Sequence, residues 1–182
     1  MAETKAKTKP KQNTEAGDVD NSSAVNVKEK QKVVAKKIDP EEYVVVRNGF
    51  YGRLIYKSSR TGERFVWEKF GDEQEITLRE LRNAKNNNKK FFENNWFLFD
   101  EDWIVSYLGV RQFYSNALSV EKFDELFSRP AEELREVIKG MNKGQKKSVA
   151  YRAMEMISNG WIDSRKTITA LEDALGIELT EK

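Results

Sequence analysis

The chain has 182 residues and contains neither histidine nor cysteine. Histidine is the usual general base near neutral pH, and cysteine and histidine supply most zinc ligands and many nucleophiles. The composition therefore excludes serine–histidine hydrolysis, thiol chemistry and structural zinc of the usual kind. Charged residues make up 34% of the chain and the net charge is only +2. These values are typical of a soluble protein that is not a polyanion binder by overall charge.

The apolar segments are too short to cross a bilayer, which takes about 18–20 consecutive apolar residues. The longest candidate, residues 95–110, is interrupted by the three acids at 100–102. The first eleven residues are polar and predict no signal peptide. The lack of cysteine is compatible with a reducing cytosol without requiring it. We therefore expect no membrane partner.

The segment over residues 1–38 differs in composition from the rest of the chain. It has no aromatic residue, and its nine lysines against five acids give it a charge of +4, which leaves −2 for the remainder. Such a segment buries too little apolar surface to offset its chain entropy, so we predict a disordered, lysine-rich arm. The arm acts either as a solubilising tail or as a segment that orders on a partner protein or on nucleic acid.

From residue 43 onward, short β-branched segments alternate with turn signals. Asn48–Gly49 is a turn signal, and the glycine of the loop at 58–62 suits a positive φ. Strands are predicted at 43–47, 53–57, 64–68 and 74–78. This spacing predicts a compact antiparallel meander, and we favour a small SH3-like barrel. Residues 96–99 are predicted to add a strand that closes the sheet.

Two helices are predicted around that last strand. Thr77 has the features of an N-cap, with Glu80 completing a capping box for a helix over residues 78–84. The polar run at 86–90 should break this helix, because asparagine competes for backbone hydrogen bonds. Asp100 is predicted to cap the next helix, which ends at Gly109.

The rest of the chain is predicted to be helical. Ser119 should cap one helix, Pro130 should lie in the first turn of the next, and a third should span residues 143–158. Asp163 is predicted to cap the last helix, with Gly176 as its C-terminal stop.

Strands followed by helices indicate an α+β fold: a small antiparallel sheet or SH3-like barrel and then a C-terminal helical bundle. The predicted domains are the arm at 1–38, a small β domain with one short helix at 39–99, and a helical domain at 100–182.

The acids at 100–102 are the clearest carboxylate cluster. Clustered carboxylates bind divalent metals, but acids at a helix start are also favoured by capping and by the helix dipole. We favour capping, and no EF-hand spacing is present. We assign no catalytic, cofactor-binding or metal residue, and we expect neither cofactor nor enzymatic activity.

Two basic segments are candidates for phosphate contacts. Residues 143–148 join Gly, Lys and Ser, but they lack the first glycine of a phosphate-binding loop and follow a helix rather than a strand. Basic residues at this helix N-terminus could contact phosphate, or they could simply form a solvated surface. We favour the solvated surface. The run at 86–90 precedes the aromatic residues at 91, 92 and 96, a mixture found in single-strand binders. We favour core packing for those aromatic residues.

A helix-turn-helix is a further alternative, with residues 143–158 as the positioning helix and 163–174 as the reader. The reader contains Arg165 and Lys166 but also Glu172 and Asp173. Its face is therefore not strongly basic.

Two stretches carry a likeness to known proteins. Residues 43–81 contain Val-Arg-Asn, Gly-Arg-Leu-Ile-Tyr, Thr-Gly-Glu and Ile-Thr-Leu-Arg-Glu-Leu, and Lys-Lys-Phe-Phe-Glu-Asn-Asn-Trp follows at 89–96. Residues 153–172 contain Ala-Met-Glu-Met-Ile and Asn-Gly-Trp-Ile-Asp-Ser. Over about residues 40–180 the chain resembles small proteins from the virion modules of tailed bacteriophages of Gram-positive hosts. The resemblance implies a non-enzymatic component of the head, neck or tail, and it carries over no functional residue.

We therefore expect a structural or assembly protein that acts through protein–protein contacts. Its partners would be other virion proteins, in a homo- or hetero-oligomer, and its location the virion, or the host cytoplasm during assembly. The alternative is a nucleic-acid-binding accessory protein that uses the arm and the 86–90 loop. The candidate contact residues for a partner or nucleic acid are Lys28, Lys30, Lys32, Lys36, Lys37, Asn87, Lys89, Lys90, Lys146 and Lys147.

Overall fold

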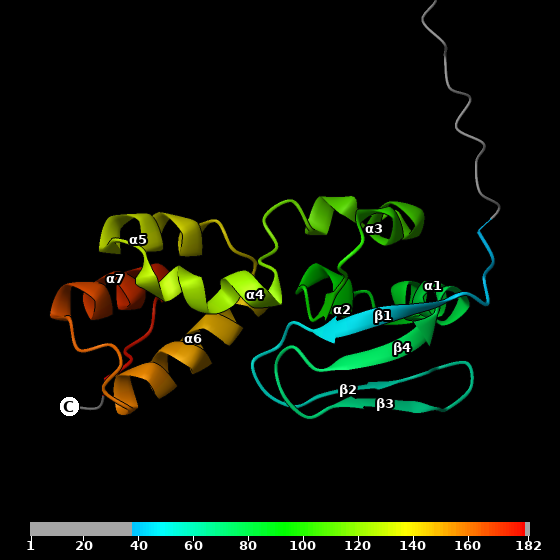
Figure 1. The fold of residues 1–182 in the computed structure, drawn as a ribbon, viewed down its shortest axis with the longest axis horizontal. Helices are drawn as coiled ribbons and strands as arrows, with labels where there is room; N and C mark the ends of the chain where they lie inside the picture. The colour runs from blue at the N-terminus through cyan, green and yellow to red at the C-terminus, as the bar shows by residue number, and fades with distance from the viewer. Residues whose placement is uncertain (1–37, 181–182) are drawn as a thin grey trace, which may run out of the picture. The chain divides into compact units, whose positions relative to one another are not determined.

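The computed structural model describes residues 38–180, which belong to one compact unit (Figure 1). The predicted disorder of the arm concerns residues that lie, apart from Ile38, outside this range. Short antiparallel strands come first along the chain and helices dominate after them, so the α+β class is confirmed.

The strands form two ladders. In the first, β1 (Tyr43–Asn48) lies between β4 (Glu73–Thr77) and β5 (Phe97–Leu98), with both pairings antiparallel. In the second, β2 (Leu54–Lys57) pairs with β3 (Arg64–Trp67). The predicted strand at 96–99 therefore does join the sheet. The continuous meander is wrong, because β1 does not pair with β2, and the SH3-like barrel stays a prediction.

The side chain of Asn48 explains the missing β1–β2 pairing. Its amide donates to the carbonyl oxygens of Gly52 and Lys69, both at 2.8 Å. The next residue, Gly49, donates its N–H to Trp96 at 2.8 Å. The buried side chain of Asn48 therefore ends β1, and the chain reaches β2 through the connection at residues 49–53, which begins at the predicted turn signal Asn48–Gly49.

Among the described residues, two α-helices precede the last strand and five follow it. The first three are α1 (Leu78–Asn87), α2 (Lys90–Glu93) and α3 (Asp102–Leu108), followed by a 3₁₀ turn at Arg111–Phe113. The later helices are α4 (Val120–Phe123), α5 (Ala131–Lys139), α6 (Lys143–Ser158) and α7 (Arg165–Leu175), with a 3₁₀ segment, Asp124–Ser128, after α4. Helix α1 runs three residues beyond the predicted end, and α6 has the predicted bounds.

The sequence predicted some helix ends correctly and others wrongly. Thr77 is the N-cap of α1, and its hydroxyl accepts from the N–H of Glu80 at 3.2 Å. Gly109 and Gly176 end α3 and α7 in the left-handed conformation that favours glycine. The predicted caps Asp100 and Asp163 are wrong. The N-caps are the residues that follow them, Glu101 and Ser164.

The first cluster of buried side chains lies between the two ladders and helices α1 to α3. Trp67, Tyr56 and Phe97 are fully buried there, and the indole N–H of Trp67 donates to the carbonyl of Val46 at 2.9 Å. Ile104 and Leu108 of α3 belong to the same cluster. The predicted boundary between residues 99 and 100 therefore does not separate the two cores.

The second cluster is built by the helices after residue 118. Fully buried residues of this cluster include Leu134 and Ile138 of α5, Val149 of α6 and Leu171 of α7. On the same helix, Met154 is 39% exposed, whereas Val149 and Ala153 are fully buried. We call the part around the first cluster the β lobe and the part around the second the helical lobe.

Close backbone contact joins the two lobes at the start of α6. A Cβ added to Gly144 would lie 2.3 Å from both the Cβ and the carbonyl oxygen of Asn94. Beside this contact, the amide of Asn142 donates to the side-chain oxygen of Asn95. The hydroxyl of Ser148 donates to the carbonyl of Gly49 at 3.1 Å. These contacts fix the first two turns of α6 against the β lobe.

Candidate interaction surface

The predicted contact residues differ in where the structure places them and in what they contact. The five arm residues Lys28, Lys30, Lys32, Lys36 and Lys37 lie outside the described range. The side chain of Asn87 donates to the backbone and side-chain oxygens of Asn83, one turn earlier in α1. Lys89 pairs with Glu93 at 3.0 Å, and its ammonium lies 5.2 Å from the ring centroid of Phe113. Asn87 and Lys89 are therefore bound to their own chain.

Three predicted residues are left, and the fold brings their elements together. Lys90 opens α2, whereas Lys146 and Lys147 lie in the second turn of α6. The two helices meet through the contact of Gly144 with Asn94, the residue that caps the end of α2. Among the described residues, none of these three lysines forms an ion pair.

A row of aromatic rings runs between those two helices. The ring of Trp96 lies 5.5 Å from Phe91 of α2 and 6.0 Å from Phe50. The ring of Phe50 lies in turn 6.0 Å from Tyr151 of α6, edge to face. Trp96 and Phe50 are half-buried, and Tyr151 is 43% exposed. The ammonium of Lys147 lies 5.5 Å from the ring centroid of Phe50 and 5.7 Å from that of Tyr151.

The solvent-facing stripe of α6 combines charge with apolar surface. Lys143, Lys147, Tyr151 and Met154 recur at four- and three-residue spacing, and all four are exposed. We call the following set the lysine–aromatic surface: Phe50, Lys90, Trp96, Lys143, Lys146, Lys147 and Tyr151.

Arg152 is the centre of an ion-pair cluster on the other side of α6. Its guanidinium donates to both carboxylate oxygens of Asp124, with 3.0 Å from Nε to Oδ1, and to Glu155 at 3.0 Å. It also donates to the hydroxyl of Tyr51 at 3.0 Å, and that hydroxyl donates to Glu155. The ring centroid of Trp161 lies 5.3 Å from the guanidinium carbon. The cluster joins α6 to the 3₁₀ segment after α4 and to the loop after β1.

Hydrogen bonding favours the charged forms of Arg152 and Glu155. The hydroxyl of Tyr51, followed by the guanidinium of Arg152, lowers the pKa of Glu155. The hydrogen bond to Asp124 raises the pKa of Arg152. A carboxylic acid that donates protons near neutral pH needs a raised pKa. The cluster is therefore better suited to joining the two lobes than to proton transfer.

A second ion-pair cluster surrounds Arg47, beside a cleft of about 280 Å³. Arg47 binds Asp100 at 2.9 Å and Glu73 at 3.0 Å, and it lies 3.9 Å from Glu121 of α4. The hydrogen bond to Asp100 is the largest of the effects that raise the pKa of Arg47. The sequence interpretation of Asp100 as a helix cap is thus replaced by an ion pair across the sheet.

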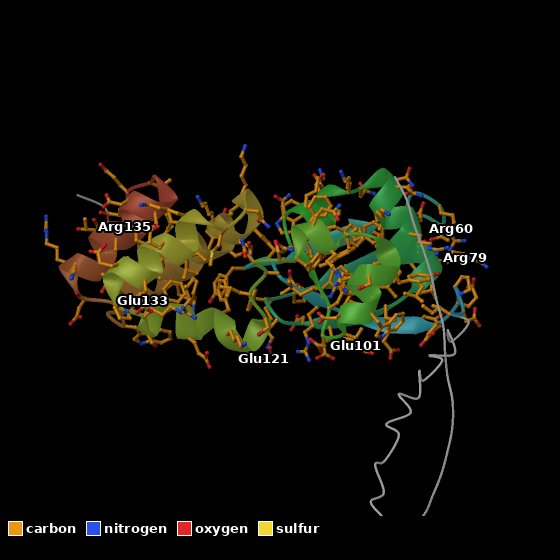
Figure 2. The ribbon with its side chains drawn as sticks, turned by 90° about the horizontal axis from the view of Figure 1, so that it is seen from above. Arg60, Arg79, Glu101, Glu121, Glu133 and Arg135 are labelled. Carbon is orange, nitrogen blue, oxygen red and sulfur yellow. The ribbon has the colours of Figure 1, made fainter. Side chains whose placement is uncertain are left out.

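Glu80 is the most deeply buried acid among the described residues, with 4% of its surface exposed. One carboxylate oxygen accepts from the hydroxyl of Tyr56 at 2.6 Å and from Asn83 at 2.9 Å. The other faces the guanidinium of Arg60 at 3.4 Å, at the edge of the β lobe (Figure 2). Burial alone would raise the pKa of Glu80, but the hydrogen bonds from Tyr56, Asn83 and Ser58 outweigh it and lower the pKa.

Within residues 38–180, no group of three or more acidic side chains could hold a metal ion, and no helix is long and apolar enough to span a membrane. Comparison of the chain with protein-family models, with curated proteins and with solved structures found no match. The interpretation of the surfaces therefore depends on the contacts described above.

Sequence reasoning missed Phe50, Tyr151 and Trp161 as surface residues. Phe50 and Tyr151 are 101 positions apart in the sequence, and only the packing of α6 on the β lobe brings their rings together. A local signal did exist for Tyr151, because it continues the four-residue spacing of Lys143 and Lys147.

Proposed function

We propose that the chain is a non-enzymatic structural or assembly protein of a tailed-bacteriophage particle, acting through protein–protein contacts. The phage context comes from the resemblance over residues 40–180. The observation that supports contact with proteins is Trp161, which is 62% exposed and yet held in one place.

The position of Trp161 is fixed from two directions. Its backbone N–H donates to the carbonyl of Met156 at 2.8 Å, and its ring lies against the guanidinium of Arg152. Arg152 is in turn held by Asp124 and Glu155. An exposed tryptophan that loses little freedom on binding is the kind of side chain that dominates interface energies. The proposed partner is therefore another particle protein or a second copy of this chain.

Mass spectrometry of particles purified from a lysate of the encoding phage tests the proposal. We expect the chain at a fixed copy number per particle. A strictly monomeric chain that is absent from purified particles would contradict the proposal.

The contact residue is tested separately with the purified full-length protein. We expect Trp161→Ala to weaken self-association, or co-purification with particle proteins, by a factor of ten or more, which is the loss typical of a buried anchor. Ile177→Ala is the matched control, because Ile177 is also an exposed apolar residue of the helical lobe, at 41%. Equal effects of the two substitutions would argue against a specific contact at Trp161.

A further inference from the structure

We propose that the lysine–aromatic surface binds a single-stranded segment of nucleic acid, with lysines contacting phosphates and the ring of Tyr151 stacking on a base. This inference does not depend on the proposed particle role. It differs from the expectation based on the 86–90 loop, because Asn87 and Lys89 are engaged with their own chain.

The surface carries a positive charge that the described part of its own chain does not neutralise. Lys90, Lys143, Lys146 and Lys147 form no ion pair among the described residues, whereas many arginines of the same range are paired with acids. Helix α6 also has no acid in its first turn. These four lysines have no carboxylate partner within residues 38–180 and lie on two helices that meet at Gly144 and Asn94, so they give the surface a positive charge that a bound polyanion would neutralise.

The rings supply the second half of the site. The row Trp96–Phe50–Tyr151 runs from the β lobe to α6, with 6.0 Å between successive ring centroids. The ammonium of Lys147 lies over the rings of Phe50 and Tyr151, so a cation accompanies the partly exposed ring of Tyr151. A cationic groove with aromatic platforms is the arrangement that binds single strands without regard to sequence, because every base presents a flat face.

A single strand fits this surface better than the other anionic partners do. In a duplex the bases are already stacked inside the helix, so an exposed ring would contact only the sugar and phosphate backbone. An acidic peptide would use the lysines, but its aliphatic side chains would gain no stacking on Tyr151. The combination of cations and rings therefore favours unpaired nucleotides, of either DNA or RNA.

The test measures binding of the full-length protein to labelled oligothymidine and oligouridine of about 20 nucleotides, which exceeds the span of one small site. Fluorescence anisotropy is recorded over a series of salt concentrations. Tyr151→Ala should weaken binding on the order of tenfold or more, and Tyr151→Phe should preserve it, because the stacking face is retained. The double substitution Lys143→Gln and Lys147→Gln should reduce the slope of log K against log salt by about 1–1.5.

Matched controls separate this surface from general charge, including the charge of the arm. Lys122→Gln with Lys166→Gln removes two exposed lysines elsewhere and should leave the slope nearly unchanged if the site is local. Thermal unfolding verifies that each variant is folded, as expected because all five side chains are exposed.

Three results would overturn the proposal. One is equal affinity for a blunt duplex of the same length, which would indicate charge alone. Another is that both the Tyr151→Ala variant and the Lys143→Gln/Lys147→Gln variant bind the oligonucleotides with the affinity of the wild type. The third is no salt-sensitive binding of either oligonucleotide, with capture of an acidic peptide instead. Each of these is independent of whether Trp161 mediates protein contacts.

Discussion

Substituting Gly144 by alanine tests how the two lobes are joined. Gly144 lies in the first turn of α6, where an alanine would normally favour the helix by about 0.5–1 kcal/mol. At this position, however, the added Cβ would lie 2.3 Å from the Cβ and the carbonyl oxygen of Asn94 and 2.8 Å from its Cα. Carbon atoms in good contact are about 3.5–4.0 Å apart. The methyl group therefore overlaps a neighbour by more than 1 Å.

The overlapped atoms cannot rotate away, because they include the backbone of Asn94. Relief requires the start of α6 to move from the β lobe, which would also strain the bond between Asn142 and Asn95. Overpacking costs about 1–3 kcal/mol and loss of one hydrogen bond about 0.5–1.5 kcal/mol. After subtraction of the helix gain, we expect Gly144→Ala to lower the free energy of unfolding by about 1–3 kcal/mol.

Urea unfolding followed by tryptophan fluorescence measures this difference. With a slope of about 1–3 kcal/mol per molar urea, a loss of 2 kcal/mol moves the midpoint by roughly 1 M. Gly140→Ala is the matched control, because Gly140 has a helical φ of −73° and a Cβ there would meet nothing closer than 3.5 Å. That variant should be as stable as the wild type or slightly more stable. A Gly144→Ala protein as stable as the wild type would refute the reasoning.

Three further predictions concern polar and surface residues. The pKa of Glu80 is lowered in the folded state, so its carboxylate should stabilise the fold above its ordinary pKa of 4.5, and this effect should be lost as the pH falls through the folded-state pKa. The stability of the wild type should therefore drop more steeply in acid than that of Glu80→Gln. Urea midpoints between pH 3 and 7 measure this difference. Tyr56→Phe should cost about 1–3 kcal/mol at pH 7, because the buried carboxylate loses its hydroxyl donor; an unchanged midpoint would show that Asn83 suffices. Arg152→Lys should cost about 1 kcal/mol, measured by thermal unfolding, because lysine cannot bind both oxygens of Asp124 at once; equal stability would mean the fork geometry does not matter.

Local sequence signals predicted the elements whose determinants are themselves local. The bounds of α6 and the glycine stops at Gly109 and Gly176 follow from periodicity and from the backbone freedom of glycine. The strand at residues 97–98 was anticipated by its run of apolar residues. Where a capping residue competes with a distant ion pair, as at Asp100, local reasoning gave the wrong partner.

For the candidate surface, the sequence determined which residue types are available and how they are spaced within one helix. It placed Lys143, Lys147 and Tyr151 on one stripe, because side chains three or four positions apart share a helix face. Only the tertiary structure decided that Phe50 and Trp96 lie beside that stripe and that the side chain of Asn48 ends β1. The physical reason is that the contacts Asn48–Lys69, Phe50–Trp96 and Phe50–Tyr151 join residues about 20 to 100 positions apart. They form only when buried cores bring the elements together, and no local pattern encodes them.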